Sequence, residues 1–349
     1  MSDASDGRRA AGPGGLNPSR ETREPVLVVE GLRKHFVSRK GFPTPRTVTV
    51  RAVEDISFRI HAGEAFGLVG ESGCGKSTAA RALLRLIEPD AGRETWKGED
   101  VLAARGRQLK TLRRRMQIVF QDPYSSLDPR QSIGSALVEP MRVHGIAEGV
   151  EARRRAGALL EEVGLPPAAL DRFPHEFSGG QRQRIGIARA LTVEPELIVA
   201  DEPVSALDVS VQAQVLLLLQ ELRQRRGLAF LFVSHDLSVV RWFCDRVAVM
   251  YLGRIVEEGP ASRVLANPLH PYAQMLRDAS PVPDPSRRGV LPRIIGEIPS
   301  AANPPPGCPF HPRCVHAMPV CSRDLPRWSQ APGQGQGQDQ GGVACHLHG

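Results

Sequence analysis

The sequence predicts an α/β fold with a parallel sheet, and three observations support this prediction. A glycine-rich segment at residues 70–78 lies between a strand-like apolar run and a helix-forming run. Several later apolar runs have the length of buried strands. Each of these runs ends in a polar residue, as expected where the strands of a parallel α/β sheet face a ligand crevice.

Length and composition limit the classes of protein to which the chain can belong. The 349 residues are enough for about two domains with a substantial core. No apolar run approaches the ~18 residues that span a bilayer, and the N-terminus lacks the apolar stretch of a secretory signal. We therefore expect a cytosolic chain that sits on a membrane only through partners. The net charge of +7 fits nucleic acid or anionic lipid, but a modest arginine excess explains it more simply.

The segment before residue 70 divides into a tail and a strand-rich region. Residues 1–24 are rich in Gly, Ser, Arg and Pro without periodicity, so we expect a disordered tail. Residues 26–29, 47–50 and 56–60 are strand-like, with a loop that contains Pro and Gly at 39–46. Phe36 fits a base-stacking role, although from the sequence alone a core aromatic is the simpler interpretation.

Residues 70–78 have the form GxxxxGK[ST], which is that of a phosphate-binding loop. The glycines let the backbone fold around a phosphate chain, and the following helix adds free N–H groups and its positive dipole end. We expect Lys76 to reach the β- and γ-phosphates and the Ser77 hydroxyl to bind Mg²⁺. The residues expected to contact the nucleotide are Gly70, Glu71, Ser72, Gly73, Cys74, Gly75, Lys76, Ser77 and Thr78.

Polar residues follow three of the predicted strands. The strand at 116–120 ends at Gln121, the strand at 197–200 ends at Asp201 and Glu202, and the strand at 228–233 leads to His235. Adjacent carboxylates at a strand end are costly unless a cation or donor compensates them. In P-loop proteins the first such Asp holds Mg²⁺, and the second can polarise an attacking water. The position of His235 at the same edge favours a phosphate contact over a core histidine.

The region between residues 133 and 177 has a mostly helical pattern without a strand of the main sheet, so we expect a helical insertion. A second glycine turn then opens a helix at Ser178, Gly179, Gly180 and Gln181. A helix N-terminus is an anion site, although this turn alone is equally consistent with a simple N-cap. We expect a helix at 209–226, ended by Gly227, and a hairpin at 247–257.

Four of the six cysteines lie late in the chain, at Cys308, Cys314, Cys321 and Cys345. A cytosolic chain does not keep structural disulfides, so a metal site is the sharper hypothesis. Their spacing, C-x5-C-x6-C-x23-C, lacks both the common zinc knuckle and the ferredoxin run. Four thiolates suit either Zn²⁺ or a [4Fe–4S] cluster. The low-complexity run at 333–342 is flexible enough for Cys345 to join the other three.

Taken in order, these motifs resemble those of the ATP-binding cassette (ABC) ATPases over about residues 26–258. The matching motifs are the phosphate loop, Gln121 as the Q-loop, Ser178–Gln181 as the signature, Asp201 and Glu202 as Walker B, Asp208 in the D-loop, and His235 as the switch histidine. The resemblance implies a RecA-like parallel sheet core with an antiparallel β subdomain, in an ATP-binding domain at 25–260. It also implies a helical insertion at about 122–177 and a small Cys-rich extension at 261–349.

A finer resemblance is to the oligopeptide/dipeptide importer ATPases, especially their second, F-type subunit. It is carried by residues 33–36, 39–43, 119–130 and 270–272 and by the cysteine-bearing tail from 296 to 345. This resemblance implies ATP hydrolysis that powers peptide import, with nickel or another small solute as the alternative cargo. The catalytic residues are then Glu202, His235 and Gln121; the Mg²⁺ ligands are Ser77, Gln121 and Asp201; and Phe36 stacks on adenine.

The same resemblance implies a set of partners and a location. The partners are a second, related cassette in a heterodimer, two integral membrane permease subunits and, indirectly, an extracytoplasmic substrate-binding protein, with no nucleic acid. The chain is then peripheral, on the cytoplasmic face of the cell (inner) membrane. The resemblance favours a [4Fe–4S] cluster over Zn²⁺ at the four cysteines. A soluble ABC ATPase that acts on nucleic acid or ribosomes is the alternative, but the chain lacks the sustained heptads of such proteins.

Overall fold

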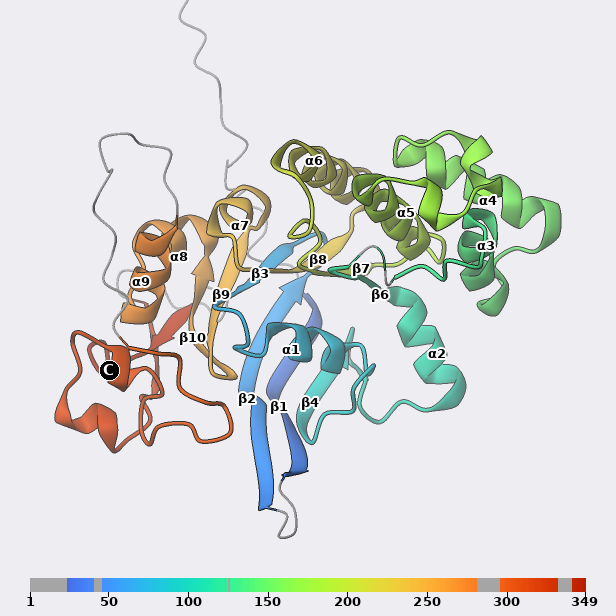
Figure 1. Ribbon diagram of the computed structural model, residues 1–349. Helices are drawn as coiled ribbons and strands as arrows, with labels where there is room; N and C mark the ends of the chain where they lie inside the picture. The colour runs from blue at the N-terminus through green and yellow to red at the C-terminus, as the bar shows by residue number, and fades with distance from the viewer. Residues whose placement is uncertain (1–23, 41–45, 123, 125, 281–295, 332–340) are drawn as a thin grey trace, which may run out of the picture.

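The computed structural model describes residues 24–40, 46–122, 124, 126–280, 296–331 and 341–349. Its centre is an eight-stranded sheet in the order β11-β12-β10-β9-β3-β8-β7-β6 (Figure 1). A four-stranded sheet with the order β2-β1-β4-β5 packs beside it. Most of the expected disordered tail, the centre of the loop at 39–46 and most of the low-complexity run lie outside the described residues.

The large sheet has a parallel part and an antiparallel part. The parallel strands are β3 (Ala65–Val69), β6 (Met116–Val119), β7 (Leu197–Asp201), β8 (Ala229–Ser234) and β9 (Arg246–Tyr251). The antiparallel strands are β10 (Arg254–Pro260), β12 (Gly342–Ala344) and β11 (Trp328–Gln330). The predicted hairpin of β9 and β10 is confirmed, and β12 extends the same sheet with the last residues of the chain.

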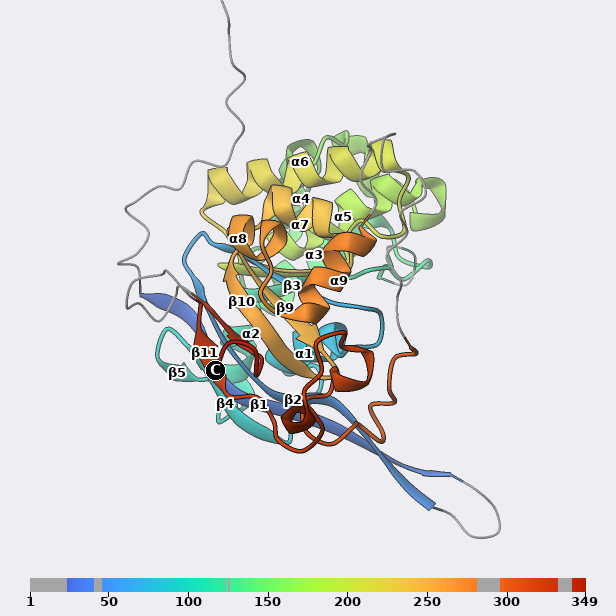
Figure 2. The same ribbon diagram turned by 90° about the vertical axis from the view of Figure 1, so that its left-hand side faces the viewer.

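The small sheet consists of β1 (Pro25–Lys40), β2 (Arg46–His61), β4 (Ala91–Trp96) and β5 (Glu99–Asp100). The β1–β2 hairpin extends away from the body in both views (Figures 1 and 2). The segments predicted as strand-like at 47–50 and 56–60 both lie in β2, which is continuous between them. Its polar middle stays extended because it pairs with β1, for example Glu54 with Arg33.

Helices cover both faces of the large sheet. They are α1 (Lys76–Leu83), α2 (Gly106–Arg115), α3 (Ile133–Val143), α4 (Gly149–Glu162), α5 (Gly179–Leu191), α6 (Val209–Arg226), α7 (Leu237–Phe243), α8 (Ala261–Ala266) and α9 (Pro271–Ala279). Short 3₁₀ turns are η2 (Pro167–Asp171), η3 (Pro174–Glu176), η5 (His311–Arg313) and η6 (Pro319–Ser322). The structure confirms the predicted helix at 209–226, which Gly227 ends in the left-handed conformation at φ 64°.

The side chains of β8 show how the sheet divides two cores. Phe230 and Phe232 pack with the helices of the insertion and of the C-terminal half. Leu231 and Val233 pack with α1 and the small sheet on the other face. Because both faces of β8 are buried, its sequence is apolar throughout and does not alternate. Polar side chains are therefore confined to the ends of such strands, which is where the candidate site lies.

The C-terminal extension is joined to the large sheet. Pairing of β12 with β10 continues the sheet into the extension, and the Arg51 amide donates a hydrogen bond to the Ala301 carbonyl oxygen over 3.0 Å. The segment that carries the late cysteines lies beside the β9–β10 end of the sheet (Figures 1 and 2). None of the helices in the described ranges has the length and apolar character needed to cross a bilayer.

Candidate functional site

The glycine-rich loop connects β3 to α1, and its shape requires glycine at two positions. A Cβ atom at Gly70 would lie 2.2 Å from the Met250 carbonyl oxygen, and one at Gly75 would lie 2.0 Å from the Ala52 carbonyl oxygen. Gly75 is also the N-cap of α1 and offers no side chain to its first N–H groups. These groups are therefore available to an anion bound in the loop.

Lys76 is buried in this loop and donates hydrogen bonds to its backbone. Its Nζ atom lies 2.8 Å from the Gly70 carbonyl oxygen and 3.0 Å from that of Glu71. The ammonium group therefore lies within the loop that the sequence assigns to a phosphate chain. The Lys76 ammonium group thus places a positive charge inside the loop.

Ser77 and Asp201 form a hydrogen-bonded pair of oxygen-bearing side chains beside the loop. The Ser77 hydroxyl donates to Asp201 Oδ1 over 2.7 Å, while Asp201 Oδ2 is buried without a hydrogen-bond partner among the described residues. Burial raises the pKa of Asp201. A buried carboxylate oxygen without a partner is costly unless a cation binds it, and Mg²⁺ prefers such ligands. The residues present therefore fit a magnesium ion.

Three polar side chains meet at one carboxylate oxygen. Glu202 Oε2 accepts a hydrogen bond from Gln121 Nε2 over 3.0 Å and lies 3.2 Å from His235 Nδ1. They meet because β6, β7 and β8 are adjacent and parallel, so that their carboxyl ends share one edge of the sheet. Glu202 adopts a left-handed conformation at φ 48°, held by a hydrogen bond from its amide to the Val233 carbonyl oxygen.

Phe36 lies apart from this group, on β1 opposite Val50. The residue is 41% exposed, and the Lys34 ammonium lies 5.6 Å from the centre of its ring. The interpretation of Phe36 as a core aromatic was therefore wrong. The exposed ring face is available for a planar ligand.

The second glycine turn caps α5. Ser178 Oγ accepts from the Gln181 amide, and Gln181 Oε1 accepts from the Ser178 amide over 3.0 Å, which forms a capping box. Ser178 and Gln181 are exposed, as is Asp208 at the N-cap of α6. Gly180 lies against α6, since a Cβ there would be 2.3 Å from Val211 Cγ1. The turn is therefore a preformed, exposed helix N-terminus.

The four late cysteines line one small cavity of the C-terminal extension. The Cys308 amide donates to the Cys321 carbonyl oxygen over 2.8 Å, and burial raises the pKa of Cys308 to about 11. Within the described ranges, no three His, Cys, Asp or Glu side chains stand close enough to hold a metal ion. Four thiols around one cavity are nevertheless a donor set that suits Zn²⁺ or an iron–sulfur cluster. The metal therefore remains a prediction.

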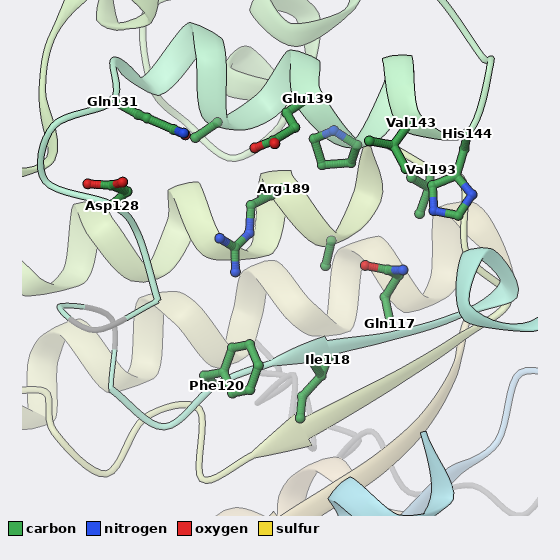
Figure 3. Close-up of a pocket in the computed structure, with 13 residues that line it drawn as sticks. Gln117, Ile118, Phe120, Asp128, Gln131, Glu139, Val143, His144, Arg189 and Val193 are labelled. Carbon is green, nitrogen blue, oxygen red and sulfur yellow. The ribbon is translucent and has the colours of Figure 1, made fainter. Parts of the chain in front are cut away.

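A larger cavity, which no sequence motif indicated, lies between β6, α3 and α5 and has a volume of about 490 Å³ (Figure 3). Arg189 of α5 and Glu139 of α3 line it, together with Phe120, which directly precedes Gln121. Arg189 also donates a hydrogen bond to the Ser126 carbonyl oxygen. The cavity therefore adjoins the segment that follows the catalytic candidate Gln121.

Two residues of the C-terminal half contact the phosphate loop at Glu71. The Arg313 guanidinium binds the Glu71 carboxylate, and the Tyr272 hydroxyl accepts a hydrogen bond from the Glu71 amide. No sequence pattern indicated that Arg313 has this contact. Its only signal is its position between Cys308 and Cys314.

Comparison with protein families and relatives gives consistent matches. A family model described as "ABC transporter" matches residues 53–205, and one described as "Oligopeptide/dipeptide transporter, C-terminal region" matches residues 256–321. The chain is 52% identical to a putative peptide import ATP-binding protein of Brucella ovis, over 88% of this chain and 94% of that protein. It is 47% identical to the oligopeptide transport ATP-binding protein AppF of Bacillus subtilis, over 93% and 98% respectively.

Solved structures of similar fold are cassettes of ABC transporters. One is cbiO1 from Clostridium perfringens, with a TM-score of 0.58, 27% identity and coverage of 70% of this chain and 91% of that chain. Another is a dimeric ATP-binding cassette in a post-hydrolysis state bound to ADP and Pi. Its TM-score is 0.59 at 28% identity, with coverage of 67% and 98%. The predicted ABC-ATPase fold class is thereby confirmed for the part of the chain that these cassettes cover.

Proposed function

Because the chain belongs to the ATP-binding proteins of the ABC transporters, in their oligopeptide/dipeptide branch, we propose that it hydrolyses ATP to power peptide import through a membrane transporter. The observation that carries this proposal is the meeting of Gln121, Glu202 and His235 at the sheet edge that also holds the phosphate loop. The named relatives are a putative peptide import protein and an oligopeptide transport protein, so an ATPase that acts on nucleic acid or ribosomes is not favoured.

Residues 70–78 bind the phosphates of ATP. In this structure Lys76 donates to the carbonyl oxygens of Gly70 and Glu71, which hold its ammonium group in the loop where it binds the β- and γ-phosphates. The free N–H groups of α1 bind the same phosphate chain. Phe36 stacks on the adenine with its exposed ring.

Ser77 and Asp201 hold Mg²⁺, with the amide oxygen of Gln121 as a further ligand. The unpartnered Asp201 Oδ2 atom supports this assignment. When bound, the ion neutralises charge that develops on the phosphates. The protein supplies an oxygen cradle whose geometry the end of β7 and the start of α1 set.

Glu202 orients the attacking water and accepts its proton. The Glu202 carboxylate is kept in one position by the hydrogen bond from Gln121 and by the contact with His235. The exposed face of His235 is available to the γ-phosphate. Positioning and electrostatic stabilisation of this kind account for most of the catalysis of phosphoryl transfer.

A second cassette completes the site. The helix N-termini of α1 and α5 are two anion-binding ends in one chain, and the α5 turn is exposed. We infer that Ser178–Gln181 contacts the ATP of a partner cassette packed head to tail, with Asp208 at the same surface. The partner is a related chain, so that the pair is a heterodimer.

Two integral membrane permease subunits and, outside the membrane, a substrate-binding protein complete the transporter. The cavity between β6, α3 and α5 supports a docking site for a helix of one permease subunit, because it adjoins Gln121. A change at the γ-phosphate then moves the helical insertion relative to the sheet, which is a rigid-body switch. The chain is peripheral, on the cytoplasmic face of the cell membrane.

We propose that the four late cysteines would hold a [4Fe–4S] cluster, with Zn²⁺ as the alternative. Their convergence on one cavity supports a shared ligand. Such a group would fasten Cys345 to the 308–321 segment across the low-complexity run. Anaerobically purified protein should be brown, with stoichiometric iron and sulfide. A colourless protein with stoichiometric zinc would refute the cluster.

The test of the function is purification from membranes together with the bound subunits. We expect co-purification of a related cassette and two permease subunits, and ATP hydrolysis that peptide with its binding protein stimulates. A Lys76→Ala variant of the same complex is the control. Stimulation by nickel in place of peptide would change the cargo assignment, and binding to ribosomes without membrane subunits would contradict the transport function.

A further inference from the structure

Three groups of Glu71, its amide, its carbonyl oxygen and its carboxylate, each form a contact with another residue. Its amide donates to the Tyr272 hydroxyl over 2.8 Å, and its carbonyl oxygen accepts from Lys76 Nζ over 3.0 Å. Its carboxylate oxygens lie 2.7 and 2.9 Å from Nη1 and Nη2 of Arg313. Backbone and side chain of this loop residue are therefore fixed from the C-terminal half of the chain.

Arg313 is built into this contact. Its side chain is 2% exposed, against 20% for Glu71. The guanidinium lies 5.9 Å from the ring centre of Tyr251 and 5.7 Å from that of Phe310. A buried arginine in a two-pronged pair with a carboxylate is both strong and directional, because the planar fork fixes both partners.

The Arg313–Glu71 pair does more than attach the extension to the core, because Glu71 is itself in contact with Lys76. The Glu71 carbonyl oxygen is one of two backbone acceptors of Lys76, the residue that reaches the phosphates. Other contacts, such as the pairing of β12 with β10, already fasten the extension to the sheet. The pair with Arg313 therefore acts at the loop itself, one residue after Gly70.

We propose that Arg313 and Tyr272 are positioning residues for the phosphate loop, so that the C-terminal extension sets the nucleotide affinity of the site. Arg313 holds the Glu71 carboxylate and Tyr272 holds its amide, which together fix the carbonyl oxygen that aligns Lys76. The proposal rests on the assignment of this loop to ATP. Neither residue touches the reacting phosphate.

The test compares full-length variants for binding of a fluorescent ATP analogue and for hydrolysis of ATP. We expect Arg313→Gln to raise the nucleotide Kd and the KM roughly tenfold, with kcat within about twofold of wild type. Arg313→Lys keeps the charge but not the fork, so its Kd should lie between the two. Tyr272→Phe removes a single oxygen atom and should raise Kd by about threefold, because it leaves the Glu71 amide unpaired.

Arg226→Gln is the matched control. Arg226 also forms a two-pronged pair, with Glu162 at 2.9 and 2.5 Å, but directly before Gly227, which leads into the amino end of β8, away from the loop. Its loss should lower the melting temperature without changing Kd. If the Arg313→Gln variant is insoluble, the Kd of the Tyr272→Phe variant tests the inference instead.

Two outcomes separate this inference from the function. If wild-type protein binds the ATP analogue and both Arg313→Gln and Tyr272→Phe bind it with unchanged Kd, the extension does not position the loop and the inference is overturned. If Arg313→Gln and Arg226→Gln raise Kd equally, general destabilisation explains the effect and the inference is also overturned. If the wild type itself binds no nucleotide, the proposed function and the inference fall together.

Discussion

Replacement of Glu202 by Gln tests the role of the carboxylate on which the other catalytic groups converge. Glu202 Oε2 accepts from Gln121 Nε2 over 3.0 Å and lies 3.2 Å from His235 Nδ1. A glutamine has the same size and keeps an oxygen that can accept from Gln121. The glutamine cannot take a proton from water. The variant therefore tests the loss of proton transfer while the packing around residue 202 stays the same.

The expected loss follows from what such a base supplies. General bases contribute about 10²–10⁴-fold in rate, and about 1.4 kcal/mol of barrier corresponds to a factor of ten. We therefore expect kcat to fall by about 10³-fold, which corresponds to about 4 kcal/mol. Lys76, which binds the phosphates, and Ser77 and Asp201, which hold Mg²⁺, do not hydrogen-bond to Glu202 in the described structure, so the ATP Kd should stay within about twofold.

The assay measures phosphate release and ATP-analogue binding on the same preparation. Glu221→Gln is the matched control, because it makes the same chemical change at an exposed pair with Arg225 on α6. It should leave both quantities unchanged. Hydrolysis by Glu202→Gln within about threefold of wild type would show that Glu202 is not the base.

Three further predictions follow. Asp201→Asn should raise the Mg²⁺ concentration needed for half-maximal hydrolysis by at least about tenfold, measured by metal titration, because the buried carboxylate loses its charge. Gly179→Asp, with no close contact at its Cβ, should abolish hydrolysis but not binding of the ATP analogue to the isolated chain, because it repels the partner's phosphates. Burial holds the pKa of His270 at about 3, so the unfolded chain binds more protons below about pH 6.5 and stability falls as the pH is lowered. His270→Asn should flatten that slope, about 1 kcal/mol per pH unit, in urea unfolding at pH 7 and 5.5.

The parts of the fold that the sequence predicted best are those set by local chemistry. The glycines of the phosphate loop, the Ser178 cap and the Gly227 stop all act within one turn of chain. The convergence of Gln121 and Glu202 also followed from the sequence, because parallel strands place their carboxyl ends at one edge. In each case a short pattern contains the whole physical cause.

The parts that could not be predicted depend on contacts between distant segments. The middle of β2 has no apolar alternation. It stays extended because it pairs with β1 and because the Arg51 and Glu54 amides donate to the carbonyl oxygens of Ala301 and Gly253. Helix α2 is mostly polar, with Leu112 as its only buried residue among those described and Leu109 half-buried against the same core. Two residues make a core-facing stripe too short to stand out in the sequence. Arg313 and Glu71 are 242 residues apart, and a buried arginine has no sequence signature that distinguishes it from an exposed one.

The way in which the extension is fastened determines how it can move. It is joined to the core by the pairing of β12 with β10, by the hydrogen bond from Arg51 to Ala301 and by the ion pair of Arg313 with Glu71. These three attachments reach the large sheet, the small sheet and the phosphate loop, so the extension cannot rotate about any single one of them. The cavity beside β6 lies between the sheet and helices α3 and α5. A motion driven by ATP should therefore turn the insertion against a rigid unit of sheet, phosphate loop and extension, with the change of position concentrated at the segment after Gln121.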